Sequence, residues 1–123
     1  MQVDVLGSTG LSSGIHYWDV QLGDSWQIGV TTKDDEETQA GLFTCSTFIG
    51  GCTLGRSGYG PLIRAEYFPK KIRVQFEQDK GKLLFYDLDT KKVISTITRK
   101  FMGLYFPFFS GDVKLIPQCP PLV

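Results

Sequence analysis

The sequence predicts an all-β fold, and three observations support this prediction. Apolar and polar residues alternate with a period of two in several segments, the pattern of half-buried antiparallel strands. The segments are short and are separated by turn residues at near-regular spacing, which is typical of a sandwich or barrel. Helix signals are weak, because the polar segment 33–39 has no apolar stripe and is expected to be a solvated acidic loop.

The N-terminal half predicts a short strand over 3–6 and then a β-hairpin. Its two strands are expected over 16–22 and 26–30, with the turn between them. Trp18 and Trp26, the only two tryptophans, lie on the apolar faces of these strands, so we expect both in the core. Glycines between residues 50 and 60 interrupt any long strand in the middle of the chain.

The C-terminal half predicts a meander with strands over 72–77, 83–86 and 93–97. Gly81 is expected to adopt the positive φ of a bulged hairpin turn. Two last strands are expected over 104–109 and 113–116. In the first of them, alternation places Phe109 on the opposite face from Phe106 and Phe108; one face is expected in the core, and Phe109 is a candidate for partner contact.

Length and charge limit the classes of protein. The chain has 123 residues, which predicts a single domain with its core over about 5–117 and a tail over 118–123. The formal net charge is zero, so no overall charge attracts nucleic acid or an anionic membrane. The chain shows neither a bilayer-spanning apolar run nor a signal-peptide pattern. We expect no nucleic-acid partner, no membrane insertion and a cytoplasmic location.

The residues that usually carry chemistry are few. Three cysteines, an odd number, argue against a closed disulfide framework, and we expect reduced, buried thiols. Cys45 and Cys52 are too far apart for a CxxC ligand pair, and a single histidine cannot complete a zinc site. That histidine, His16, lacks a recognised nucleophile motif, so we expect it to be structural. The sequence therefore predicts no catalytic residue, no metal and no cofactor, and a protein that is not an enzyme.

The order of several motifs resembles a SPRY domain. The segments that carry the resemblance are LGS at 6–8, SGIHYWDV at 13–20, WQIGV at 26–30, IRVQFE at 72–77, GKLLFYD at 81–87, LYFPFFS at 104–110 and VKLIP at 113–117. They are most similar to the PRY-SPRY type found in tripartite-motif ubiquitin ligases, butyrophilins and fish innate-immune receptors. The sequence holds little of the PRY segment expected before Val5, so we expect either a SPRY-only form or a truncated one. Arg73 and Glu77 replace the glycine and aspartate that are usual in the family, and Phe43 stands for the aromatic of its "GYW" element.

The resemblance implies a bent antiparallel β-sandwich of two sheets, of the concanavalin or jelly-roll kind. It also implies a non-catalytic module that binds a protein or peptide through loops at one end, in a ubiquitin-ligase or innate-immune context. An alternative is a sensor of a small anionic metabolite, of the butyrophilin type, which needs convergent basic residues. The candidates for these are Arg56, Arg64, Lys70, Lys71 and Arg73. A missing PRY segment would leave an edge strand uncovered and open to self-association.

We expect partner contacts from side chains in the loops. Arg56 and Tyr59 are the first candidates, because Arg and Tyr are favoured interface anchors. The acidic run 34–37 fits equally well with solubility and with a rim that steers a basic partner. Several phenylalanines are expected either in the core or in contact with a partner. The full candidate set is Asp24, Asp35, Glu36, Phe43, Phe48, Arg56, Tyr59, Phe109 and Asp112.

Overall fold

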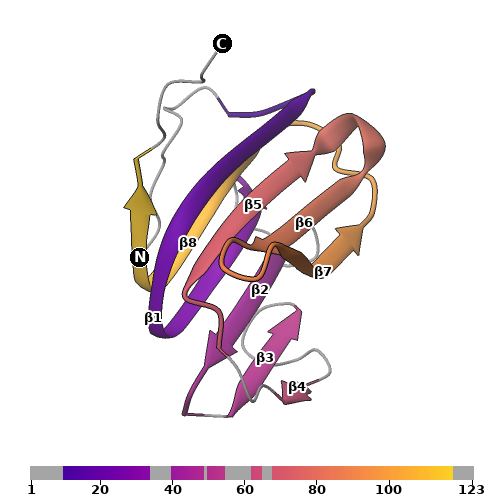
Figure 1. The fold of residues 1–123 in the computed structure, drawn as a ribbon. Coiled ribbons are helices and arrows are strands. Elements are labelled where there is room, and N and C mark those ends of the chain that lie inside the picture. The colour runs from indigo at the N-terminus through magenta and orange to yellow at the C-terminus, as the bar shows by residue number, and fades with distance from the viewer. Residues whose placement is uncertain (1–9, 34–39, 49, 55–61, 65–67, 118–123) are drawn as a thin grey trace.

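The described part of the chain is almost entirely β-strand. The computed structural model describes residues 10–33, 40–48, 50–54, 62–64 (backbone only) and 68–117. The elements in Figure 1 are β1 (Ile15–Thr32), β2 (Gly41–Ser46), β3 (Gly51–Leu54), β4 (Leu62–Arg64), β5 (Lys71–Glu77), the 3-10 turn η1 (Gln78–Lys80), β6 (Lys82–Asp87), β7 (Lys92–Thr98) and β8 (Tyr105–Ile116). In this part of the chain, no helix has the length and hydropathy of a transmembrane segment.

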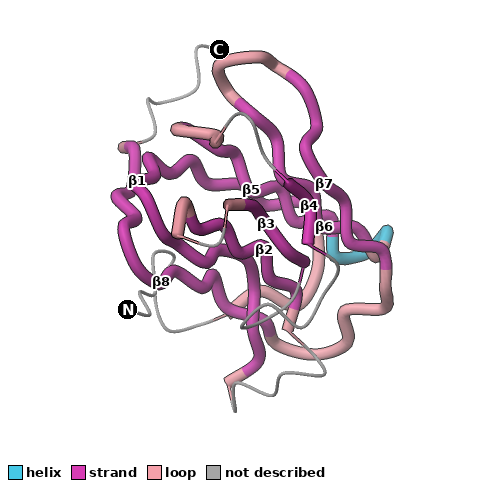
Figure 2. The backbone as a smooth tube through the Cα atoms, turned by 90° about the horizontal axis from the view of Figure 1, so that it is seen from below, coloured by secondary structure: helices cyan, strands magenta, loops and turns pink. Residues whose placement is uncertain are grey.

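The long strand β1 connects two layers. It pairs with β5 over Ile15–Gln21, with β2 over Ser25–Val30, and with β8 along its other edge. The hydrogen-bonded order is β4-β3-β2-β1-β5-β6-β7, a curled antiparallel sheet with β8 beside β1 (Figures 1 and 2). The rings of Phe43 on β2 and Phe85 on β6 lie 5.0 Å apart, although these strands are not neighbours in the sheet. The two ends of the sheet therefore fold over one another, which confirms the predicted all-β sandwich.

Aromatic rings fill the space between the layers. Trp18 and Trp26 are 2% and 3% exposed, which confirms that both tryptophans belong to the core. Trp26 meets Phe43 edge to face, with ring centroids 5.5 Å apart. Phe76 and Phe101 make a second edge-to-face pair at 5.1 Å. Such pairs contribute about 1 kcal/mol beyond the burial of their area, so they help to hold the curled sheet closed.

The predicted hairpin at the two tryptophans is wrong, because both segments belong to the single strand β1. Both halves run antiparallel to β8, so the chain cannot reverse between them. The residues expected to form the turn lie instead in an irregularity between the pairs Leu22↔Val113 and Trp26↔Gly111. The two strands expected over 104–109 and 113–116 are likewise one strand, β8, that runs through the same irregularity.

The central meander is confirmed. β5, β6 and β7 pair in sequence, and their bounds lie within two residues of those predicted. Gly81 ends the η1 turn with φ +66°, the left-handed conformation expected of it. The strand predicted over 3–6, most of the acidic loop and the tail fall outside the described residues.

Candidate functional site

An extra loop of β1 forms a bulge against β8. Gly23, Asp24 and Ser25 on β1 stand opposite Asp112 alone on β8. Glycine is required on both sides of this irregularity. A Cβ on Gly23 would lie 2.7 Å from Cβ of Asp112, and Gly111 has φ +82° with its Cβ position 2.5 Å from the Ser25 carbonyl oxygen. The bulge presents two exposed carboxylates, Asp24 and Asp112, on adjacent strands.

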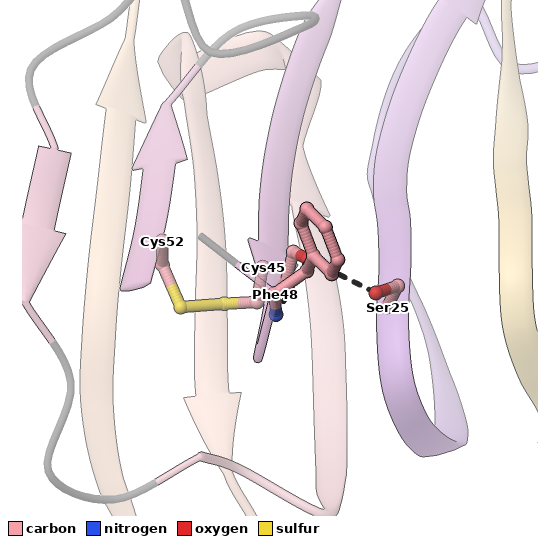
Figure 3. The surroundings of a disulfide bond; sticks show 5 residues. Ser25, Cys45, Phe48 and Cys52 are labelled. Atoms are coloured by element: carbon pink, nitrogen blue, oxygen red, sulfur yellow. Dashed lines mark hydrogen bonds between the residues drawn. A yellow bond between two sulfur atoms is a disulfide. The ribbon is translucent and has the colours of Figure 1, made fainter. Parts of the chain in front are cut away.

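The turn between β2 and β3 is fastened to this bulge. Thr47 donates its backbone N–H to the carbonyl oxygen of Asp24 at 3.0 Å. The hydroxyl oxygens of Ser25 and Ser46 lie 3.0 Å apart in a hydrogen bond, drawn as a dashed line in Figure 3. Phe48 donates its N–H to the Ser46 hydroxyl at 3.2 Å. These bonds fix the position of the turn relative to the bulge.

Phe48 stands on this turn with its ring in solvent. The residue is 96% exposed, more than any other large hydrophobic residue in the described part of the chain. At this exposure the ring makes little contact with the described part of the chain, so its apolar face is available to a partner. Large aromatic side chains with an exposed apolar face are favoured anchors in protein interfaces.

A disulfide joins the two strands that carry the turn. Cys45 on β2 and Cys52 on β3 are direct cross-strand partners with Cα atoms 4.0 Å apart, and their sulfurs are bonded (Figure 3). The expectation of reduced thiols at these positions is therefore wrong. The odd cysteine count was misleading because two cysteines pair locally across a hairpin, whereas the third, Cys119, lies outside the described residues.

A shallow depression adjoins the bulge and the turn. Its volume is about 280 Å³, and the side chains around it include Ser25, Gln27, Thr44, Ser46 and Ser110. The Gln27 amide donates to the Thr44 hydroxyl at 2.8 Å, so part of the lining is held in place. We define the bulge-turn surface as Asp24, Ser25, Ser46, Phe48 and Asp112.

The structure brings together three of the nine predicted contact residues, Asp24, Phe48 and Asp112. Phe43 and Phe109 are 1% and 3% exposed, so both are wrong as candidate contact residues and both rings belong to the core. The remaining candidates lie outside the described residues; they are Asp35, Glu36, Arg56 and Tyr59. Sequence reasoning missed Ser25, which lay within the predicted turn, and Ser46, which carried no local signal.

Two other candidate residues have structural roles. His16 lies with Nε2 2.8 Å from the Ser13 carbonyl oxygen, and the ring N–H donates this bond. His16 thus makes the kind of hydrogen bond expected of a structural histidine. Arg73, a candidate for an anion pocket, is paired with Asp19 at 2.8 Å. Among the residues that the structure describes, His, Cys, Asp and Glu form no group of three suited to hold a metal ion.

Known proteins are similar to this chain in sequence and in fold, although no protein-family model matches it. The E3 ubiquitin-protein ligase TRIM31 of Mus musculus is 32% identical over an alignment of 119 residues, which covers 89% of this chain and 24% of that protein. Butyrophilin subfamily 1 member A1 of Mus musculus is 30% identical over 114 residues, which cover 85% of this chain and 22% of that protein. The chain thus spans about a quarter of the length of these relatives.

A solved structure extends the comparison to the fold. The crystal structure of the TRIM65 PSpry domain superposes with a TM-score of 0.72 at 18% identity, covering 90% of this chain and 69% of that chain. The relatives, the order of the sequence motifs and the curled β-sandwich agree with one another. Together they support the assignment of this chain as a PRY-SPRY domain.

Proposed function

We propose that this chain is a non-catalytic module that binds a segment of a partner protein across the bulge-turn surface. The observation that carries the proposal is the Phe48 ring, 96% exposed on a turn that hydrogen bonds hold against the bulge. A rigid anchor loses little conformational freedom on binding, so more of its contact energy is retained as affinity.

The chemistry of the surface selects the kind of segment. The Phe48 ring offers an apolar face, and the bulge to which its turn is bonded carries the exposed carboxylates of Asp24 and Asp112. A segment with a lysine or arginine next to an apolar residue would suit both features. Its cation binds carboxylates and can also stack on an aromatic face, and its apolar residue can pack on the Phe48 ring. The hydroxyls of Ser25 and Ser46 add hydrogen-bonding groups to this surface.

The relatives support a role within a larger protein. One of them is named an E3 ubiquitin-protein ligase, and this chain matches about a quarter of its length. In a protein of that kind, the domain would select the substrate while ubiquitin transfer takes place elsewhere. We extend the proposal to recognition in a ubiquitin-ligase or innate-immune context.

Selection from a phage library of random peptides tests the surface directly. We expect the selected peptides to carry Lys or Arg beside an apolar residue. In calorimetry with a selected peptide, Phe48→Ala should weaken binding about tenfold or more, as expected for an anchor residue. The matched control is Leu104→Ala, which removes another exposed apolar side chain (52% exposed) away from the bulge. Unchanged affinity in Phe48→Ala would contradict the proposed surface.

We also propose a cytoplasmic location, which the similarity to a ubiquitin ligase supports. Disulfides rarely persist in the reducing cytosol, so this location requires that the Cys45–Cys52 bond of the structure be reduced in the cell, with the hydrogen bonds to the bulge still holding the turn. Alkylation of free thiols during cell lysis, followed by mass spectrometry, measures their state. A persistent Cys45–Cys52 disulfide in cells would contradict the cytoplasmic location and leave the proposed surface unaffected.

A further inference from the structure

The strand β7 forms one end of the sheet. Within the described residues it pairs with β6 and with no other strand. Arg99 donates its backbone N–H to the Gly81 carbonyl oxygen at 3.0 Å, which fixes the direction of the peptide groups before it. Because these groups alternate between the two sides of a strand, Thr96 and Thr98 turn their N–H and C=O away from β6. β7 therefore presents outward backbone donors and acceptors.

The side chains of β7 suit the addition of another strand. Residues 93–98 read VISTIT, in which every residue except the serine is β-branched. Val93 and Ile94 are 50% and 38% exposed. The register shifts opposite these two residues, so the regular stretch is Ser95–Thr98. An exposed edge of this composition can accept an extended peptide, with main-chain hydrogen bonds providing affinity.

Positive charge lies at both ends of this edge. Lys91 and Lys92 precede the strand and Lys100 follows it, and all three are exposed. A depression of about 570 Å³ adjoins the C-terminal end, lined by the η1 turn and by residues 98–102. Met102, 76% exposed, gives this depression an apolar wall.

The depression itself carries more positive than negative charge. Lys80, Arg99 and Lys100 line it, together with the single carboxylate of Asp79. That carboxylate accepts the backbone N–H of Gly14 at 3.0 Å. An acidic side chain at this end of an added strand would therefore meet at least two exposed ammonium groups, those of Lys80 and Lys100.

These charges decide which strand fits the edge. Two copies of the chain joined through β7 would bring Lys92 of one copy near Lys100 or Lys92 of the other, depending on strand direction. Like charges across a strand pair are destabilising, and lysines on an edge oppose self-pairing. A strand with carboxylates at both ends meets opposite charges in either direction.

We propose that the β7 edge binds an extended segment of a partner protein that has β-branched or apolar residues at its centre and Asp or Glu at both ends. This surface shares no residue with the bulge-turn surface, so the inference goes beyond the proposed function. The two surfaces call for opposite charge in the partner, because the bulge-turn surface is acidic and this edge is basic.

A labelled synthetic peptide, Asp-Glu-Val-Thr-Val-Thr-Val-Asp-Glu, provides the probe, with binding measured by fluorescence anisotropy. Thr96→Pro removes an outward N–H without touching a bond to β6, and proline is tolerated on edge strands. It should weaken binding about tenfold or more. The matched control is Thr96→Val, which keeps the N–H and the β-branched shape and should leave the affinity within about twofold.

Amide hydrogen exchange on the unmodified protein gives a test that needs no variant. The outward amides of Thr96 and Thr98 should exchange rapidly in the free protein and become protected when the peptide binds. Protection that stays unchanged at peptide saturation would overturn the proposal, whatever the Thr96→Pro variant does.

Charge reversal tests the choice of partner. Lys92→Glu combined with Lys100→Glu should weaken the binding of the acid-ended peptide. The same variant should strengthen the binding of a lysine-ended peptide with the same central sequence. Equal binding of the two peptides to the unmodified protein would overturn the assignment of an acidic partner. Sedimentation of a dimer that Thr96→Pro dissociates would also overturn it, because the occupant would then be a second copy.

Discussion

Asp19 and Arg73 face each other across β1 and β5 and form a two-bond salt bridge. Arg73 donates from Nε to Oδ1 of Asp19 at 2.8 Å and from Nη2 to Oδ2 at 3.0 Å. The Arg73 guanidinium also lies 4.4 Å from the centre of the Tyr17 ring. The hydrogen bond to Asp19 raises the pKa of Arg73 above its usual value. The pair thus links the two strands on the outer face of the sheet.

We predict a measurable coupling between these two residues. Because Arg73 is 35% exposed at its side chain, solvent screens the pair, and the coupling should be about 1 kcal/mol. A double-mutant cycle with Asp19→Asn and Arg73→Gln, followed by urea unfolding, measures it. Lys71→Gln, an exposed cation on the same strand, is the control and should change stability by less than about 0.5 kcal/mol. Additive effects of Asp19→Asn and Arg73→Gln would contradict the prediction.

The Asp19–Arg73 pair also shows what the sequence could predict and what it could not. Alternation placed Val74 and Phe76 inside and Arg73 outside, and their burial agrees. The partner of Arg73 could not be predicted, because Asp19 is 54 residues away and only the register between β1 and β5 brings the two together. Local patterns specify the face of a strand, whereas register depends on the whole sheet.

The hairpin predicted at the two tryptophans is wrong for the same reason. Gly23, Asp24 and Ser25 are good turn residues, and a local interpretation predicts a reversal of the chain. Only the pairing of β8 with both halves of β1 shows that the chain continues in the same direction. Likewise, Phe48 and Phe109 looked equivalent in sequence, but Phe109 faces the core and Phe48 stands on a turn.

Removal of the disulfide should destabilise the domain and loosen the Phe48 turn. The cross-link closes a short loop, with Cys45 and Cys52 seven positions apart, and its loss costs roughly 2 kcal/mol by the loss of chain constraint in the unfolded state. Urea unfolding of Cys45→Ala combined with Cys52→Ala measures this cost. The Thr47 amide, which donates to Asp24, should exchange faster in the variant.

A reductant provides the control for the disulfide prediction. A phosphine reductant should lower the stability of the unmodified protein and leave the double variant unchanged. If reductant has no effect on the unmodified protein, the disulfide does not contribute to its stability in solution.

Gly111→Ala should disrupt the bulge more than an equivalent change elsewhere. Gly111 has φ +82°, and an added Cβ would lie 2.5 Å from a backbone oxygen of Ser25. We expect a loss of roughly 2 kcal/mol or more, together with weaker binding at the bulge-turn surface. Gly103→Ala is the matched control, because Gly103 has φ +89° but nothing within 4 Å of the Cβ position. Gly103→Ala should lower the free energy of unfolding by only about 1 kcal/mol. An equal loss in both variants would show that the close approach at the bulge is unimportant.

Burial of Tyr105 should make the domain sensitive to alkaline pH. The residue is 2% exposed, and this burial raises the pKa of its phenol above the ordinary value of 10.0, partly offset by the nearby Arg99 charge. The folded state therefore holds the proton more tightly than the unfolded state. The resulting stability is fully present below a pH of about 10 and is lost as the pH rises toward the folded pKa.

Urea unfolding of the unmodified protein and of Tyr105→Phe, compared at neutral and at alkaline pH, measures this contribution. Tyr105→Phe keeps the ring, which packs against Phe76 and Phe101, but has no proton to lose. Above a pH of about 10, the unmodified protein should lose stability relative to Tyr105→Phe, because only its unfolded state gains by releasing the phenol proton. The difference in free energy of unfolding between the two proteins at neutral pH is the reference. A difference that stays constant into the alkaline range would show that the Tyr105 phenol ionises equally well in the folded and unfolded chains.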